Sequence, residues 1–212
     1  MRPRTDRRSR QGLESRQRII DATFAIANEL GYQGTSIAKV SARSGLPASS
    51  VYWHFADKDE LFAEMLQSSF DQWNEAMPSW DSSPAGGPDG PSRHEVVTHQ
   101  LRSAVASISS GPEFWRLGLM LALERQAIEP VARKRFVEIR RSVLETLAAF
   151  WASALPPRIV ERSPGLPELL ARFTMATTDG IFISAQVDSP YDLSMLADLL
   201  ADSLEAAATR LV

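Results

Sequence analysis

The sequence predicts an all-α protein in which an N-terminal three-helix helix-turn-helix domain is followed by a larger helical domain. Apolar residues recur three and four positions apart along most of the chain, the period of an amphipathic helix, and no useful stretch alternates as a strand would. The tripeptide Gly45-Leu46-Pro47 separates two short helical patterns near the N-terminus. Prolines at 112, 130, 156, 157, 167 and 190 then divide the C-terminal part into helices.

The domain organisation follows from shifts in composition. Residues 1–13 are polar and rich in arginine, so we expect a disordered basic arm. We expect the helix-turn-helix domain over residues 14–62 and the second domain over residues 63–212. Residues 78–92 contain four prolines and three glycines, which predicts a loop or linker.

The first helix is expected from about Glu14 to Leu30, ended by Gly31 as a C-terminal cap. Its apolar stripe consists of Ile19, Ile20, Thr23, Ile26, Ala27 and Leu30. Thr35 or Ser36 then caps the second helix, where a hydroxyl and free backbone donors could hold a phosphate.

The third helix is short and is expected to bury Val51 and Phe55, which are four residues apart. This orientation turns Ser49, Ser50 and Trp53 outward and places Tyr52 and His54 on the flanks. Such a face suits the base edges and phosphates of a DNA groove. The next helix, from Asp57 to about Met77, has Asp57 as its cap and Glu60 where a capping box places a carboxylate.

Residues 16–62 resemble the TetR family of bacterial transcriptional regulators. The residues that carry this resemblance are the run Val51-Tyr52-Trp53-His54-Phe55, Lys58, Leu61, Gly45, Gly31-Tyr32 and Thr35-Ser36. Pro47 departs from the family pattern, because a hydroxyl residue usually begins the recognition helix. In the rest of the chain, only the helical layout and the length are similar to the family. The resemblance implies a homodimer that binds a near-palindromic operator and responds to a small molecule.

The outward face of the third helix gives specific expectations for DNA binding. We expect Ala48, Ser49, Ser50 and Trp53 to face base edges, Ala48 through a thymine methyl group. We expect phosphate contacts from Thr35, Ser36, Tyr52, His54 and Lys58. Arg4, Arg7, Arg8 and Arg10 could fold onto a neighbouring minor groove, or the arm could be an inert tail.

Charge and composition agree with a nucleic-acid partner for the N-terminal part alone. Residues 1–58 hold ten Lys and Arg against five Asp and Glu, whereas the remainder holds thirteen against twenty-one. The absence of cysteine excludes disulfides and thiolate sites. No apolar run is long enough to span a bilayer, so we expect a cytoplasmic protein.

The C-terminal part is expected to bind an effector and to form the dimer. Helices are predicted at about 93–110, 112–127, 130–155, 166–187 and 190–211. The family resemblance implies that the last two helices form a four-helix bundle with those of a second subunit; a core stripe within one chain is the alternative. The expected interface residues are Ala176, Gly180, Ser184, Leu196, Leu200 and Leu204. The residues that could line an apolar effector pocket are Trp115, Met120, Phe150, Trp151, Phe173, Met175 and Thr178, although side chains of this kind are more often plain core.

Asp179 lies in an apolar stretch, where an unpaired carboxylate is costly. It could orient a ligand, or it could pair with an arginine across the dimer.

The sequence offers no catalytic, metal or cofactor motif. His94 and His99 are five residues apart and diverge by roughly 140° on a helix, so they do not form the zinc-protease pair. The family resemblance implies a DNA-binding repressor released by an apolar effector, and we predict this function, without cofactor or enzymatic activity. Two alternatives are an architectural DNA-binding protein without an effector and a small helical enzyme.

Overall fold

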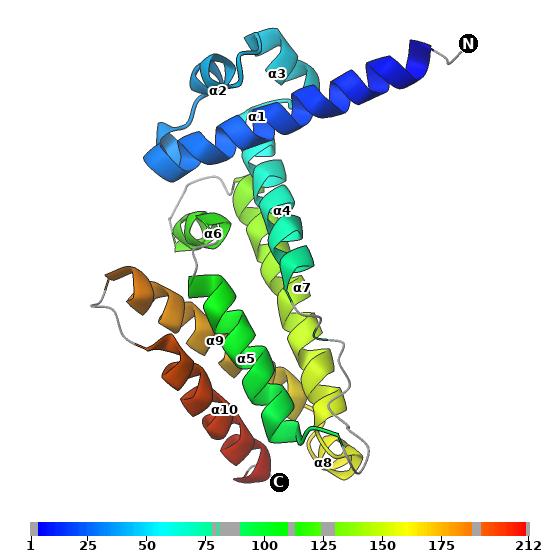
Figure 1. Ribbon diagram of the computed structural model, residues 1–212, viewed down its shortest axis with the longest axis vertical. Helices are drawn as coiled ribbons and strands as arrows, with labels where there is room; N and C mark the ends of the chain where they lie inside the picture. The colour runs from blue at the N-terminus through cyan, green and yellow to red at the C-terminus, as the bar shows by residue number, and fades with distance from the viewer. Residues whose placement is uncertain are drawn as a thin grey trace. The chain divides into compact units, whose positions relative to one another are not determined.

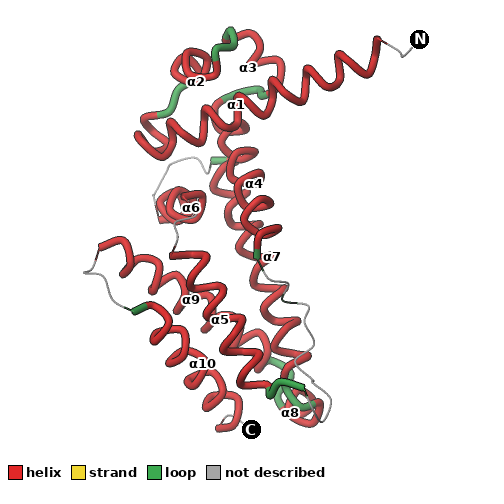
Figure 2. Tube along the Cα trace, in the orientation of Figure 1, coloured by secondary structure: helices red, strands yellow, loops and turns green. Residues whose placement is uncertain are grey.

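The computed structural model describes residues 4–77, 80, 90–109, 113–123, 130–187 and 192–210, with side chains from Arg10 onward except at 108 and 109. Within these ranges every regular element is a helix, which confirms the all-α class (Figures 1 and 2). The chain forms two compact units. The first comprises Met1–Gln72 with Glu113–Ile139, and the second comprises Trp73–Pro112 with Arg140–Val212. The first unit thus contains more than the segment expected for the helix-turn-helix domain.

Helix α1 (Arg4–Gly34) begins ten residues earlier than predicted. The expectation of a disordered arm over residues 1–13 is therefore wrong from Arg4 onward. The reason is that arginine and glutamine are good helix formers, and extending an existing helix costs much less than starting one. Gly31, at φ 69° and ψ −176°, interrupts the helical backbone as the sequence predicts. Ile19, Ile20, Ile26 and Ala27 form the buried stripe, whereas Leu30 is exposed.

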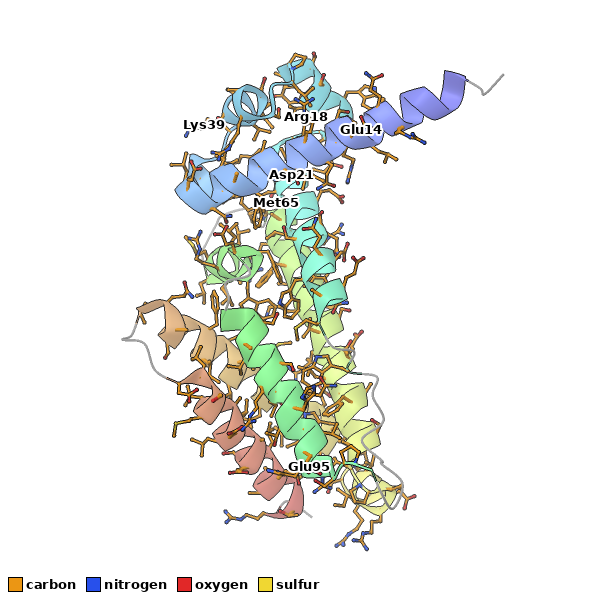
Figure 3. All side chains as sticks on the ribbon, viewed as in Figure 1. Glu14, Arg18, Asp21, Lys39, Met65 and Glu95 are labelled. Carbon is orange, nitrogen blue, oxygen red and sulfur yellow. The ribbon has the colours of Figure 1, made fainter. Side chains whose placement is uncertain are left out.

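Helices α2 (Ile37–Ser44) and α3 (Ala48–His54) form the helix-turn-helix (Figure 1). Ser36 caps α2 by accepting a hydrogen bond from the backbone N–H of Lys39. Gly45 ends α2 with left-handed backbone, φ 67°, and donates its N–H to the carbonyl oxygen of Ser41. Arg18, labelled in Figure 3, extends from α1 and donates to the Ser44 carbonyl oxygen at 2.6 Å. The turn is thus fixed by both its own backbone and α1.

Helix α4 (Lys58–Ala76) begins after the predicted Asp57 cap, and the Glu60 carboxylate turns back as in a capping box but binds the N–H of the residue before the cap. The Asp57 carboxylate accepts the N–H groups of Asp59 and Glu60, each at 2.8 Å, and the Glu60 carboxylate accepts the N–H of Ala56 at 2.6 Å. Leu61, Phe62, Met65, Leu66 and Phe70 are buried along the helix; Figure 3 labels Met65. Local sequence thus determines where the helix-turn-helix ends.

Helix α6 (Glu113–Leu123) and the start of α7 (Val131–Ala154) complete the first unit. A Cβ on Gly118 would lie 2.1 Å from ring atoms of Phe136, so only glycine allows this close approach of α6 to α7. Phe70, Phe114, Trp115 and Phe136 form a chain of edge-to-face ring contacts. One face of α6 is thus buried, whereas Met120 and Leu123 remain exposed.

The second unit contains α5 (Arg93–Ser109), the rest of α7, α8 (Pro157–Arg162), α9 (Leu166–Val187) and α10 (Leu193–Arg210). The short helix α8 is not predicted from the sequence, because Pro156-Pro157 reads as a break. Proline is nevertheless favoured in a first helical turn, where its missing N–H costs nothing. Ion pairs Arg93–Glu205 and Arg102–Asp198, both at 2.6 Å, join α5 to α10.

Most of the predicted 78–92 loop lies outside the described residues. Within it, the Trp80 ring packs edge-to-face on Phe150 at 5.1 Å. Ser92 forms a capping box with Glu95 at the start of α5, with hydrogen bonds of 2.7–3.2 Å. These bonds lower the pKa of the Glu95 carboxyl.

Asp179 is paired within its own chain. Its two carboxylate oxygens accept hydrogen bonds from the Arg140 guanidinium of α7 at 3.0 and 2.6 Å. Both side chains are mostly buried. Pairing of this carboxylate with an arginine is as expected, but the arginine does not come from a second subunit. In the described part of the chain, no helix has the length and hydropathy needed to cross a membrane.

Candidate nucleic-acid interface

The outward face of α3 is the most distinctive surface of the first unit. Val51 and Phe55 are buried, at 0% and 2% exposure, whereas Tyr52 and Trp53 are 57% and 75% exposed. Ser49 is exposed, and Ala48 and Ser50 are half-buried. The predicted orientation of the helix is therefore confirmed, and all four residues expected to face base edges reach the surface.

The exposed ring of Trp53 is held in place by contacts with neighbouring residues. Its ring lies edge-to-face on the His54 imidazole, with 4.5 Å between centroids. On its other side it approaches Gly12 of α1, where a Cβ would lie 3.8 Å from the ring. An indole held in this way loses less conformational freedom on binding than an unrestrained one.

His54 links the end of α3 to α1. Its Nε2 atom lies 2.8 Å from the Ser15 hydroxyl, and the adjacent Arg16 guanidinium lies 5.3 Å from the centroid of the Phe55 ring. Partial burial, and secondarily the positive charge of Arg16, lower the pKa of His54 below its ordinary value. In the protein without DNA, the His54 imidazole is therefore protonated less readily than an ordinary histidine side chain.

The other residues predicted to contact phosphates differ in whether their side chains reach the surface. Thr35 is 2% exposed and its hydroxyl donates to the Gly31 carbonyl oxygen at 2.8 Å, so the expectation of a phosphate contact from its side chain is wrong. A threonine there fixes the turn after α1 and leaves the capping role to Ser36. Ser36 and Tyr52 reach the surface.

Lys58 is half-buried and engaged by the protein. Its Nζ donates to the Tyr32 carbonyl oxygen at 3.2 Å and lies 4.0 Å from the centroid of the Tyr32 ring. To reach a phosphate it would have to exchange these contacts.

Lys39 is a cation that the sequence reasoning missed. It lies in the first turn of α2, exposed, next to the Ser36 cap, and its Nζ donates to the Gly34 carbonyl oxygen at 2.7 Å. Figure 3 labels it on α2. A lysine three residues after a helix cap is the signal that could have identified it.

The basic N-terminal residues have a helical rather than irregular backbone. Arg4, Arg7 and Arg8 belong to α1, their side chains are not among those described, and Arg10 is exposed. A flexible arm that folds into a minor groove does not describe residues 4–13 of this structure.

The residues predicted to line one effector pocket come from both units, and Phe150, Trp151 and Met175 share one core cluster. Trp115 and Met120 belong to the first unit, and the others belong to the second. Trp115, Phe150, Trp151, Met175 and Thr178 are buried core residues; for example, Trp151 Nε1 lies 3.4 Å from the Thr174 hydroxyl. Phe173 and Met120 are instead exposed, at 45% and 52%. Large apolar side chains fill cores and line pockets equally well, so the assignment of these residues to an effector pocket stays a prediction.

The predicted dimer residues also divide into two groups. Leu200 and Leu204 are buried in the core of their own chain, so assigning them to an interface is wrong. Ala176 and Gly180 are exposed, and Ser184 and Leu196 are half-buried. Six residues of α9, which we call the α9 outer row, share an exposed, apolar, outward-facing position at spacings of three and four: Leu169, Phe173, Ala176, Gly180, Ile183 and Val187. On α10, Met195 and Leu199 are exposed at 68% and 61%.

The described residues contain no cluster of three or more His, Asp or Glu side chains that could hold a metal ion. His94 instead lies 3.8 Å from the Asp202 carboxylate of α10.

Comparison with known proteins identifies the first unit most clearly. Residues 19–65 match the model for bacterial regulatory proteins of the tetR family. The chain is 30% identical over 92 residues to the HTH-type transcriptional regulator AcrR of Shigella flexneri, covering 43% of this chain and 42% of that protein. The chain thus aligns with less than half the length of AcrR.

Two further similarities extend over most of the chain. It is 28% identical over 196 residues to the HTH-type transcriptional regulator BetI of Burkholderia thailandensis, covering 90% of this chain and 91% of BetI. The crystal structure of the multidrug binding protein EbrR complexed with imidazole is 25% identical, with a TM-score of 0.61, and covers 89% of this chain and 93% of that one.

Proposed function

The chain belongs to the TetR family of bacterial helix-turn-helix transcriptional regulators, and from that premise we propose that it is a homodimeric repressor. In this proposal it binds a near-palindromic operator in the cytoplasm and is released by a small apolar effector. It acts through binding, without catalysis.

The observation that carries the proposal is the exposed face of α3. Trp53 is 75% exposed on a seven-residue helix whose Val51 is fully buried. One face of the helix therefore packs on the protein, and the opposite face is open to solvent. Ser49 and Ser50 supply hydroxyl groups beside it. In a major groove, hydroxyls can donate to or accept from base edges, and Ala48 can contact a thymine methyl group.

Phosphate contacts would fix the orientation of α3 on the duplex. Ser36, Lys39 and Tyr52 are suited to this role because they reach the surface around the helix-turn-helix. His54 and Lys58 would contribute after exchanging their contacts with Ser15 and Tyr32. Arg10 and the other arginines of the first turns of α1 would add positive charge near the DNA.

The α9 outer row supports a dimer through α9 and α10. A two-fold axis would pack this row against the same row of a second subunit and cover its exposed apolar side chains. The small side chains of Ala176 and Gly180 would let the two helices approach closely. Two recognition helices related by a two-fold axis would require a near-palindromic site.

Release by an effector is supported by the similarity to EbrR, a multidrug binding protein. An effector weakens DNA binding only by its preference for the form that does not fit the operator, and a coupling of about 1–3 kcal/mol changes affinity roughly 5- to 150-fold.

The test is selection of bound sequences from random double-stranded DNA by the full-length protein. We expect one short near-palindrome. Trp53→Ala should weaken binding to it by about 1–3 kcal/mol per subunit and affect random DNA much less. Val137→Ala, at a 37% exposed residue of α7, is the control and should match the wild type. Binding without sequence preference would instead indicate an architectural DNA-binding protein, and no binding would refute the proposal.

A further inference from the structure

A pocket lies within the first unit, between the end of α1 and α6. It has a volume of about 470 Å³ and is lined by residues 30–33 of α1 and by Leu117, Met120, Leu121 and Leu123 of α6. Met120 is the one residue of the predicted effector pocket that lines it. We propose that this pocket binds a compact, uncharged, mainly apolar molecule and is the regulatory site of the protein.

The shape of the pocket depends on Gly31. The residue turns the backbone at φ 69°, and a Cβ placed on it would meet no atom within 4 Å. The turn therefore opens space beside the helix instead of filling it. Around this space, Leu30 and Met120 are 49% and 52% exposed, which leaves apolar surface uncovered.

The size and lining indicate a small molecule as the occupant. Pockets for small ligands measure about 300–1,000 Å³ and combine an apolar lining with a few polar groups. Here the polar lining residues are Tyr32 and Gln33, beside six apolar or glycine residues. A stable protein partner needs about 800 Å² on its side of an interface, far more surface than eight residues around one cavity provide. No charged residue lines the pocket, so a charged ligand would be desolvated without compensation.

One wall of the pocket is tied directly to the start of α4. The Tyr32 carbonyl oxygen accepts from Lys58 Nζ, its ring packs edge-to-face on Phe62 at 4.9 Å, and its hydroxyl lies 3.4 Å from the Asp59 carboxylate. The first turn of α4 follows α3 after only three residues. A ligand that displaces Tyr32 therefore acts on the end of the helix-turn-helix.

The same carboxylate also reaches α7. The Asp59 carboxylate accepts hydrogen bonds from the backbone N–H groups of Val131 and Ala132, the latter at 3.1 Å. It therefore caps α7, although Val131 lies 72 residues later in the sequence. The opposite wall is joined to α1 as well, because Arg116 of α6 donates to the Asn28 carbonyl oxygen at 3.0 Å. The two helices that line the pocket are thus connected by hydrogen bonds to each other and, through Tyr32 and Asp59, to α4 and α7.

The test uses the full-length protein and the neutral fluorescent probe N-phenyl-1-naphthylamine, whose emission rises in apolar surroundings. We expect saturable binding by the wild type. Met120→Trp, which fills the pocket, and Met120→Glu, which places a charge in it, should each lower probe affinity at least tenfold. The control variants Val137→Trp and Val137→Glu change another exposed residue of the same unit outside the lining, and should bind within twofold of the wild type.

Two results would overturn the inference: no binding by the wild type, or equal binding by wild type and both Met120 variants. The regulatory part rests on the proposed function and has its own readout. The probe should weaken binding to the selected DNA sequence in the wild type and in the Val137 variants, but much less in the Met120 variants. Failure to select any DNA sequence would refute the proposed function while leaving Met120-dependent probe binding intact, so the two failures are distinguishable.

Discussion

Helices α3 and α9 both expose large apolar side chains, but the surroundings of those side chains differ. On α3 the exposed rings of Tyr52 and Trp53 each carry a polar atom and lie beside the hydroxyls of Ser49 and Ser50. On α9 the outer row is aliphatic apart from Phe173 and extends along a 22-residue helix. The face of α3 can therefore be exposed to water and can bind a polyanion. The α9 outer row is instead suited to contact with another apolar surface.

The same exposed fraction therefore indicates different partners on the two helices. Phe173 and Tyr52, at 45% and 57%, differ little in exposure. What distinguishes them is the chemistry of the neighbours on the same face. Variants that change only one of the two faces test whether the neighbours determine the partner.

The largest effect is expected on α9. Ile183→Asp would place a carboxylate in the α9 outer row, and a two-fold interface would contain two of them. Each uncompensated buried charge costs roughly 3–5 kcal/mol, so the dimer dissociation constant should rise more than about 100-fold. Sedimentation velocity over a concentration series measures it.

Thr146→Asp is the matched control, because this residue is exposed on α7 of the same unit and outside both α9 and α10. It should dimerise like the wild type. If Ile183→Asp does so as well, the α9 outer row is not the interface.

A smaller effect distinguishes core from surface on α10. Leu204 is fully buried and Leu199 is 61% exposed, although both belong to one leucine-rich helix. Leu204→Ala should lower the free energy of unfolding by about 2–5 kcal/mol. Leu199→Ala should have little effect on the unfolding of a subunit and should weaken dimerisation instead. Urea unfolding at several protein concentrations separates the two, and an equal loss in both variants would contradict the assignment.

On the DNA-binding side, Lys39 and Ser50 should affect different properties. Lys39→Ala removes an exposed cation and should weaken binding to all sequences alike, reducing the salt dependence by about one unit. Ser50→Ala should change mainly the preference among sequences, by about 1 kcal/mol. Binding to the selected sequence and to random DNA at several salt concentrations tests both, and identical patterns in the two variants would contradict the assigned roles.

The parts of the fold that sequence predicted well are those set by local interactions. The Asp57–Glu60 capping box, the glycine turns and the outward face of α3 depend on residues a few positions apart. The choice between Thr35 and Ser36 as the cap was left open because both hydroxyls suit the position. Only the packing of the chain shows that Thr35 is buried.

The incorrect predictions concern distant contacts. Leu200 and Leu204 could not be told from Leu199 by periodicity, because a core and a partner helix both require apolar side chains. The Arg140–Asp179 pair joins residues 39 positions apart, and the α1–α6 pocket joins segments nearly ninety positions apart. No local pattern records which distant element each side chain contacts. The early start of α1 was missed because a polar, arginine-rich segment is compatible with both a helix and a disordered arm.

The smallest predicted effect concerns His54, where α3 meets α1. Partial burial and Arg16 lower its pKa, so the folded protein binds this proton less readily than the unfolded chain does. The stability contributed by neutral His54 is therefore complete above the ordinary histidine pKa and declines as the pH falls through that value towards the folded-state pKa. Acidification from pH 8 to pH 5 should destabilise the wild type slightly more than His54→Gln.

NMR titration of the His54 imidazole, with and without the selected DNA, tests both this shift and the role of the residue on DNA. Without DNA the pKa should lie below the ordinary histidine value. A phosphate beside the ring favours the charged form, so DNA should raise the pKa if His54 contacts the backbone. An unchanged pKa on DNA would mean that His54 only holds α3 against Ser15, and the contact with DNA would then depend on Tyr52, Trp53 and their neighbouring hydroxyls.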